Sequence, residues 1–267
     1  MKSLSLQGLK NLKGVDIQGV REVEIDVPNI ERIYYGAVSH KPSKMNFDSC
    51  RNLRDLTIMN TKIDFVITDI WFLNLFAKCP LLESLKLVEC FMFEKIRISS
   101  SQLKSLVLSN CSTMEEIEID TPNLASFRYY FAGDDLPSIS FRRCSSQLDV
   151  NVQLHMIPTC LHQLGKFVKQ FRPRKLLTSL SLSMRQEYVH YHYWDAEEED
   201  EEEEEDPFSL PAKFPAPTIK HLFIRSVREV KPENYLLFVY RLFHCWYPET
   251  ISLSLNPSHG SKEFIKV

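Results

Sequence analysis

The chain repeats one arrangement of apolar positions, in which a leucine-like residue is followed three and five positions later by two more. The clearest copies begin at Leu82, Leu103 and Leu124, and the step between successive copies is the same both times. Each copy ends in an apolar–polar alternation, which predicts a half-buried strand. Further copies begin at Leu53, Leu177 and Ile219, a weaker copy begins at Ile30 and a partial one at Met1. The recurrence therefore predicts a stack of similar coils, each of which contributes a strand.

A second alternating phrase lies about halfway between the strong copies. It begins at Phe93 and again at Met114, so it recurs with the same step as the first phrase. Each coil should therefore hold two short strands, one on each side. A period of about 20–29 residues with this phrase is typical of leucine-rich repeats. We predict an α/β fold: a leucine-rich-repeat solenoid with parallel strands, short helices and a β-rich convex side. An antiparallel sandwich with evenly spaced strands is the alternative.

Two cysteines fit the repeat. Cys90 lies three residues after Leu87, and Cys111 lies three residues after Leu108. Leucine-rich repeats place Asn or Cys in this slot, so we expect both thiols to point inward and to satisfy backbone groups between coils. Their spacing is unlike the short paired spacing of zinc ligands. The seven cysteines and the lack of a secretory-type leader at Met1 predict free thiols in the cytoplasm or nucleus.

Helices are predicted at three places between strands. Apolar residues recur at helical spacing over 69–78, over about 159–171 and over about 232–246. After the last of these, alternation resumes at Ile251 and Leu253, which predicts another strand. No apolar run reaches the length of about 18 residues that a transmembrane helix needs, so we expect no membrane contact.

The net charge of −3 is unevenly distributed. Residues 197–206 are ten consecutive acids, and the rest of the chain has 32 basic residues against 25 acidic ones. Like charges in such a run repel each other, which predicts a disordered, solvated loop. The loop is either a tolerated insertion or a segment that attracts a basic partner. We therefore divide the chain into a repeat solenoid (1–190), an acidic, proline-flanked loop (191–217) and a C-terminal strand–helix–strand segment that completes the repeat domain (218–267).

The chain offers little catalytic chemistry. It contains no Gly-x-Ser-x-Gly, no His-Glu-x-x-His and no glycine-rich phosphate loop, so we expect neither an enzyme nor a bound cofactor. His190, His192 and Asp195 form the densest polar cluster, but a third strong metal ligand is missing beside the two histidines. Aromatic residues such as Tyr129 and Tyr130 follow the strand phrase without a basic groove, which makes nucleic acid an improbable partner.

The remaining function is recognition of a protein by the strands. Because side chains alternate along a strand, residues between the leucines should point away from the core, toward the concave face of the solenoid. The candidate partner-binding residues are Asp55, Thr57, Lys86, Ser105, Ser126, Arg128 and Tyr130. Arg128 and Tyr130 are the strongest candidates, because Arg and Tyr are enriched at interface hot spots.

Four segments resemble one known family. Residues 79–90 and 103–111 resemble the repeat hallmark of plant F-box/leucine-rich-repeat proteins of the FBD-like type. Residues 119–124 resemble their linking half-turn, and residues 242–251 resemble their closing block. The resemblance implies a protein–protein recognition module like the substrate-binding region of an F-box type ubiquitin-ligase subunit.

One feature departs from that family. Its members usually begin with an F-box, a helical region that docks onto a Skp-type adaptor, whereas here a repeat-like phrase starts at Met1. We therefore expect this chain to lack the docking part, and a Skp-type adaptor to bind only a longer form. The protein target is unknown. The alternative function is a stand-alone repeat scaffold, or a nucleic-acid-associated binding protein, unrelated to ubiquitin.

Overall fold

The structure of the chain is a computed structural model. It describes residues 3–37, 44–47, 49–59, 69–90, 94–111, 113–133, 136–156, 164, 167–168, 170–171, 177–184, 218–226 and 247–254. The chain forms two compact units, Met1–Val152 and Gln153–Val267.

The described elements are almost all short strands. The first unit contains β1 (Ser3–Gln7), β2 (Gly14–Gln18), β3 (Glu22–Asp26), β4 (Arg32–Gly36), β5 (Lys44–Asn46), β6 (Asp55–Met59), α1 (Asp69–Lys78), β7 (Ser84–Val88), β8 (Lys95–Ser99), β9 (Ser105–Ser109), β10 (Glu116–Thr121), β11 (Ser126–Ala132) and β12 (Ser138–Cys144). Strand β13 (Asp149–Met156) begins in the first unit. The second unit contains β14 (Leu177–Met184), β15 (Thr218–Ser226) and β16 (Tyr247–Ser254).

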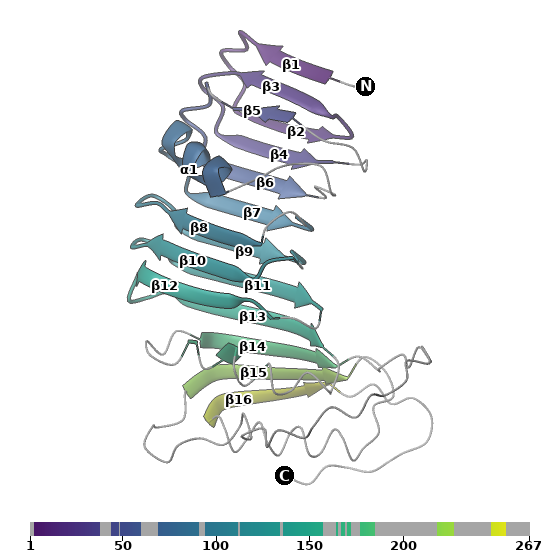
Figure 1. Ribbon diagram of the computed structural model, residues 1–267, viewed down its shortest axis with the longest axis vertical. Helices are drawn as coiled ribbons and strands as arrows, with labels where there is room; N and C mark the ends of the chain where they lie inside the picture. The colour runs from purple at the N-terminus through teal and green to yellow at the C-terminus, as the bar shows by residue number, and fades with distance from the viewer. Residues whose placement is uncertain are drawn as a thin grey trace, which may run out of the picture. The chain divides into compact units, whose positions relative to one another are not determined.

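The first unit is a solenoid with two layers of parallel strands (Figure 1). One layer, here called the main sheet, has the order β2-β4-β6-β7-β9-β11-β13. Its register follows the sequence repeat, because Leu85 pairs with Leu106 and Leu106 pairs with Phe127. The predicted parallel solenoid is therefore confirmed, and the antiparallel sandwich is excluded for this unit.

The second layer consists of two smaller sheets, β1-β3-β5 and β8-β10-β12. The half-way phrases of the sequence form β8 and β10, where Ile96 pairs with Ile117 and Ile98 with Ile119. The β-rich second side of the coil was therefore predicted correctly. In Figure 1, helix α1 lies between β5 and β8 in this layer.

Helix α1 belongs to a longer coil. The step from Leu53 to Leu82 is longer than the two equal steps that follow it, to Leu103 and to Leu124. The helix has the predicted bounds and ends at Cys79-Pro80, where the buried Cys79 N–H donates to the Leu75 carbonyl at 2.8 Å. Main-sheet pairing is unaffected by the extra length, since β6 still pairs with β7 along all five residues.

The core lies between the two layers. The three apolar residues of each strong repeat phrase are fully or almost fully buried, as are the isoleucines of β8 and β10. Phe127 of β11 meets Phe141 of β12 edge-on, with ring centroids 5.5 Å apart. Tyr35 is buried and donates its hydroxyl hydrogen to the Val20 carbonyl at 2.6 Å. Alternate side chains from both layers therefore fill one interior, as stacking requires.

A recurring tight turn leads into several main-sheet strands. In Val27-Pro28-Asn29-Ile30 and Thr121-Pro122-Asn123-Leu124, the last N–H donates to the first carbonyl at 3.2 and 3.1 Å. Cys79-Pro80-Leu81-Leu82 closes in the same way at 3.1 Å. Proline at the second position fixes the backbone angle that this turn needs.

A second turn follows the strands and uses left-handed backbone. Glu89 and Asn110 both have φ of +53°, and Gly8 and Gly19 take φ of +70° and +73°. The N–H of Glu89 donates to the Ser109 carbonyl at 2.8 Å, and that of Asn110 donates to the Tyr130 carbonyl at 2.7 Å. These bonds join each turn to the next coil.

The structure corrects one assignment and adds strands that were not predicted. Leu4 and Leu6 were assigned to the main phrase, but β1 pairs with β3 and lies in the second layer. The first main-sheet strand is β2 instead, and it pairs with β4. Strands β2, β5, β12 and β13 have no counterpart in the prediction.

The second unit holds a parallel sheet with the order β14-β15-β16. Leu180 pairs with Leu222, and Leu222 pairs with Ile251. Strand β16 was predicted, yet Ile251 and Leu253 remain 43% and 39% exposed. Within the predicted helix at 159–171, Leu164, Phe167, Val168 and Phe171 are buried. The predicted helix at 232–246 and the acidic loop lie outside the described residues, so the proposed three-part division stays a prediction.

Candidate functional site

The candidate site is the outward face of the main sheet in the first unit, here called the strand face. Its residues alternate with the buried leucines, so β6, β7 and β9 each place three side chains on it. All seven predicted partner-binding residues lie on this face, and all are exposed or half-buried: Asp55, Thr57, Lys86, Ser105, Ser126, Arg128 and Tyr130. Their role in binding stays a prediction.

The register arranges the strand face in rows. The first row begins with Arg32 and Asp55 and continues through Ser84, Ser105 and Ser126. Neighbouring strands in a sheet lie about 4.8 Å apart, so each row presents side chains at nearly constant intervals.

The two other rows differ in character. The middle row contains Thr57, Lys86, Val107 and Arg128, and is therefore cationic toward β11. The third row ends at Tyr130 and includes Val88, which is only 9% exposed. Val88 is thus closer to a core residue than its outward position in the sequence suggested.

The two repeat cysteines occupy the slot that the sequence predicts. Cys90 and Cys111 are buried free thiols. The Cys90 thiol lies 3.9 Å from the Ile58 carbonyl, and the Cys111 thiol lies 3.9 Å from the Leu87 carbonyl, each in the preceding coil. Contact with Cys90, together with burial, raises the pKa of the Cys111 thiol well above its ordinary value. Cys111 therefore keeps its proton and serves as a weak donor inside the stack.

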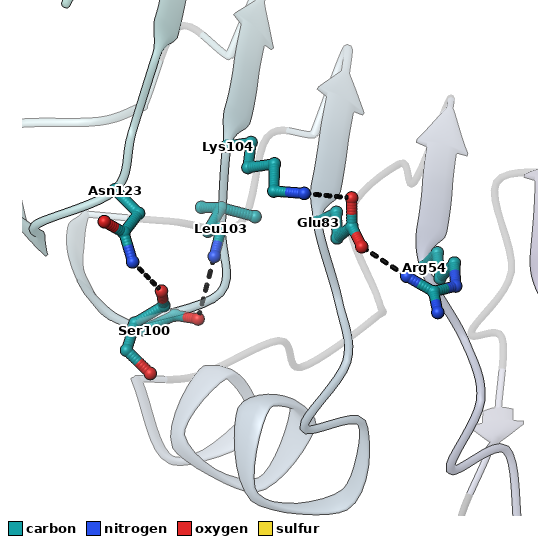
Figure 2. Close-up of polar contacts among 7 residues, drawn as sticks. Arg54, Glu83, Ser100, Leu103, Lys104 and Asn123 are labelled. Atoms are coloured by element: carbon teal, nitrogen blue, oxygen red, sulfur yellow. Dashed lines mark hydrogen bonds and ion pairs between the residues drawn. The ribbon is translucent and has the colours of Figure 1, made fainter. Parts of the chain in front are cut away.

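A ladder of opposite charges lines the beginning of the main-sheet strands. The ion-pair ladder consists of Lys13, Glu31, Arg54, Glu83 and Lys104. Lys13 contacts Glu31 at 2.6 Å, and Lys104 contacts Glu83 at 2.7 Å. Figure 2 shows Glu83 between Lys104 and Arg54, with an ion pair to each. Backbone hydrogen bonds also join the coils at these residues, because the Glu83 N–H donates to the Arg54 carbonyl at 2.8 Å.

The ladder shifts the titration of its carboxylates. The hydrogen bond from Lys104, aided by the nearby charges of Lys104 and Arg54, lowers the pKa of Glu83 below its usual value. The hydrogen bond from Lys13 likewise lowers the pKa of Glu31. Both carboxylates therefore stay charged, and both already form ion pairs within the chain.

The second layer neutralises its own charges in a similar way. Glu118 on β10 has a side chain only 9% exposed and forms ion pairs with Arg97 of β8 and Arg142 of β12. Arg143 holds Asp120 through two hydrogen bonds of 2.5 and 2.6 Å, and this contact lowers the pKa of Asp120. An acidic strand thus lies between two basic strands.

The ladder was missed at the sequence level, although a signal was present. Each of its members directly follows the first apolar residue of a repeat phrase or of its β2 counterpart. From Lys13 to Lys104, the residues at this position in successive phrases alternate strictly between positive and negative charge. The cue is invisible when each phrase is read separately, because the partners are 18 to 29 residues apart.

Comparison with known families agrees with this geometry. A family model described as At1g61320/AtMIF1, LRR domain, matches residues 38–194, which is more than half of the chain. The chain belongs to this LRR family. The matched region of the LRR chain runs from β5 to β14 and so includes most of the main sheet and the ladder residues Arg54, Glu83 and Lys104. Searches of curated proteins and of solved structures found no match.

Within the described ranges, no helix has the length and apolar character needed to cross a bilayer. The same part of the chain holds no group of three or more His, Cys, Asp or Glu side chains placed to hold a metal ion. His190, His192 and Asp195 lie outside it.

Proposed function

We propose that the chain is a protein-recognition module that binds its partner with the strand face of the first unit. The single observation that carries this proposal is the unbroken register from β4 to β11, which holds outward side chains in straight rows while their neighbours are buried. LRR domains build extended surfaces of this kind for binding.

The finer proposal follows the resemblance to plant F-box/leucine-rich-repeat proteins. In a longer form that carries an F-box, the strand face would select the substrate of a ubiquitin ligase, and the F-box would recruit the Skp-type adaptor. The free thiols of the described cysteines support action in the cytoplasm or nucleus. The chain would then act by positioning a substrate and not by catalysis of its own.

The binding proposal is tested by truncating two predicted contact residues. Arg128→Ala with Tyr130→Ala should reduce capture of interacting proteins from cell extract by about tenfold or more, because Arg and Tyr side chains are typical hot spots. The matched control is Arg51→Ala with Gln102→Ala, which truncates two exposed turn residues away from the strand face. Unchanged capture of every interactor by the Arg128/Tyr130 variant would refute the strand face as the binding surface.

The ligase proposal needs its own test. A form with an F-box should co-purify with a Skp-type adaptor, whereas residues 1–267 alone should not. The captured partner should also turn over more slowly when Arg128 and Tyr130 are truncated in the longer form. A partner whose lifetime is the same with both versions would favour a stand-alone scaffold.

A further inference from the structure

Most strand cations of the first unit already have an anionic partner. The ion-pair ladder uses Lys13, Arg54 and Lys104, and the second layer uses Lys95, Arg97, Arg142 and Arg143. Three cations of the strand face, Arg32, Lys86 and Arg128, differ. All three are exposed, and none has a carboxylate within ion-pair distance among the described residues. Arg32 lies beside Asp55 in the register, whereas Lys86 and Arg128 have no acidic outward neighbour on β7, β9 and β11. Their charges are therefore available to something outside the chain.

The register brings these two cations into one patch. Lys86 pairs with Val107, and Val107 pairs with Arg128, so the cations lie two strand intervals apart. That separation is about 10 Å between their Cα atoms. We define the cationic patch as Lys86, Ser105, Val107, Ser126, Arg128 and Tyr130. None of the outward residues on β7, β9 and β11 is acidic.

We propose that the cationic patch binds an acidic segment of a protein partner, an inference that rests on the strand face being the binding surface. An extended run of Asp or Glu presents a carboxylate about every 7 Å along one side. The two cations are farther apart than two such carboxylates, but the long, flexible side chains of Lys86 and Arg128 can reach across the difference. The hydroxyls of Ser105, Ser126 and Tyr130 add hydrogen-bond donors for carboxylate oxygens, and Val107 leaves a shallow apolar floor between the cations.

A protein segment fits this patch better than nucleic acid. Binding to phosphodiesters draws its affinity from many neutralised phosphates, whereas the patch offers two cations. Asp55 and Asp16 lie on β6 and β2, outside the patch, so a short acidic segment over β7 to β11 avoids them, whereas a longer nucleic-acid backbone along the face would cross them.

The test measures binding of a defined peptide to the full chain. The probe is a fluorescent peptide with a short run of glutamates flanked by glycine and serine, compared with the same peptide in which glutamine replaces glutamate. Fluorescence anisotropy should show binding of the acidic peptide, at least about tenfold weaker binding of the glutamine peptide, and loss of binding as salt rises from about 50 mM to about 500 mM.

Paired variants locate the binding site. Lys86→Gln with Arg128→Gln should weaken binding of the acidic peptide by about tenfold, because each exposed ion pair contributes only a few-fold to the affinity. Lys10→Gln with Arg51→Gln removes the same charge from two exposed turn positions and should leave the affinity within about twofold. Equal unfolding midpoints in urea establish that all versions are folded.

The outcomes separate this inference from the proposed function. Equal affinity of the wild type and the Lys86/Arg128 variant, or tighter binding of an oligothymidylate than of the acidic peptide, would overturn the acidic-segment inference. If the Arg128/Tyr130 truncation still abolished capture of a partner, the strand face would stand and only its chemistry would be wrong. Failure of both experiments would remove the strand face as well.

Discussion

Single residues in this protein are fixed by their place in the coil more than by their own preferences. The left-handed turns after β7 and β9 show this clearly. Asn110 suits a φ of +53°, whereas Glu89 is held at the same angle despite its side chain. A non-glycine residue in this region costs about 1–2 kcal/mol, and the cost is smaller for asparagine than for most.

Exchanging these two residue types should therefore change stability in opposite directions. Glu89→Asn is expected to raise the free energy of unfolding by about 0.5–1 kcal/mol, and Asn110→Ala to lower it by a similar amount. Urea denaturation of both variants measures the two effects. A loss of stability in Glu89→Asn would show that the Glu89 side chain makes a contribution larger than the backbone strain.

The ion-pair ladder predicts a specific dependence of stability on pH. The pKa of Glu83 is lower in the folded protein than its usual value near 4.5. Such a carboxylate contributes stability above its unfolded pKa and loses that contribution as pH falls through its folded pKa. The melting temperature of the wild type should therefore decrease below about pH 4.5, in part because Glu83 becomes protonated.

Glu83→Gln removes that part of the pH dependence. Between about pH 7 and about pH 3, its melting temperature should change less than that of the wild type, because glutamine does not titrate in this range. The control is Glu115→Gln, an exposed acid outside the ladder, which should follow the wild-type curve. Parallel curves for the wild type and Glu83→Gln would mean that the ladder adds nothing to stability.

At the scale of elements, each strand divides sharply between its two faces. Leu106 is fully buried and Val107, its neighbour on β9, is half-exposed on the strand face. Removing the side chain of a buried leucine leaves a cavity that close-packed coils cannot fill. Removing an outward valine leaves none.

The adjacent pair Leu106→Ala and Val107→Ala tests this division. Leu106→Ala should lower the free energy of unfolding by about 2–5 kcal/mol, whereas Val107→Ala should change it by less than about 1 kcal/mol. Chemical denaturation of both variants provides the comparison. Similar losses at the two positions would contradict the alternation on which the strand face depends.

The elements that the sequence predicted are those with a strong local period. The strands between Leu53 and Tyr129 could be predicted because each phrase contains the alternation of a strand and recurs at the interval of the stacked coils. Strand β13 was missed because its buried residues, Val150, Val152 and Leu154, are spaced by two and never form the repeat phrase. Leu4 and Leu6 were misplaced because an alternating pair fits either layer, and only pairing with β3 decides between them.

The candidate site was predictable only in part, for a related reason. Alternation alone places Lys86 and Arg128 outward. It does not reveal that Lys104 and Arg54 form ion pairs with Glu83, because those pairs depend on which coils are adjacent. Without that knowledge, every exposed cation of the strands looks equally available.

At the scale of the whole molecule, stacked coils interact mainly with their neighbours, so stability is nearly a sum of local terms. A defect in one unit should then loosen that unit first. Leu222 is fully buried on β15 and pairs with Leu180 and Ile251 on the adjacent strands.

Hydrogen exchange of Leu222→Ala provides the test. The amides of β14, β15 and β16 should exchange faster than in the wild type, by about tenfold or more, while those of β4 to β9 keep their protection. Uniformly faster exchange in both units would indicate a single cooperative structure instead.

The coil that contains α1 has a consequence for how such a protein can change. Its additional length is absorbed away from the strand face, and Asp55 still meets Ser84 as Ser84 meets Ser105. An insertion in the wall that holds α1 can therefore change the length of one coil while the strand face keeps its evenly spaced rows.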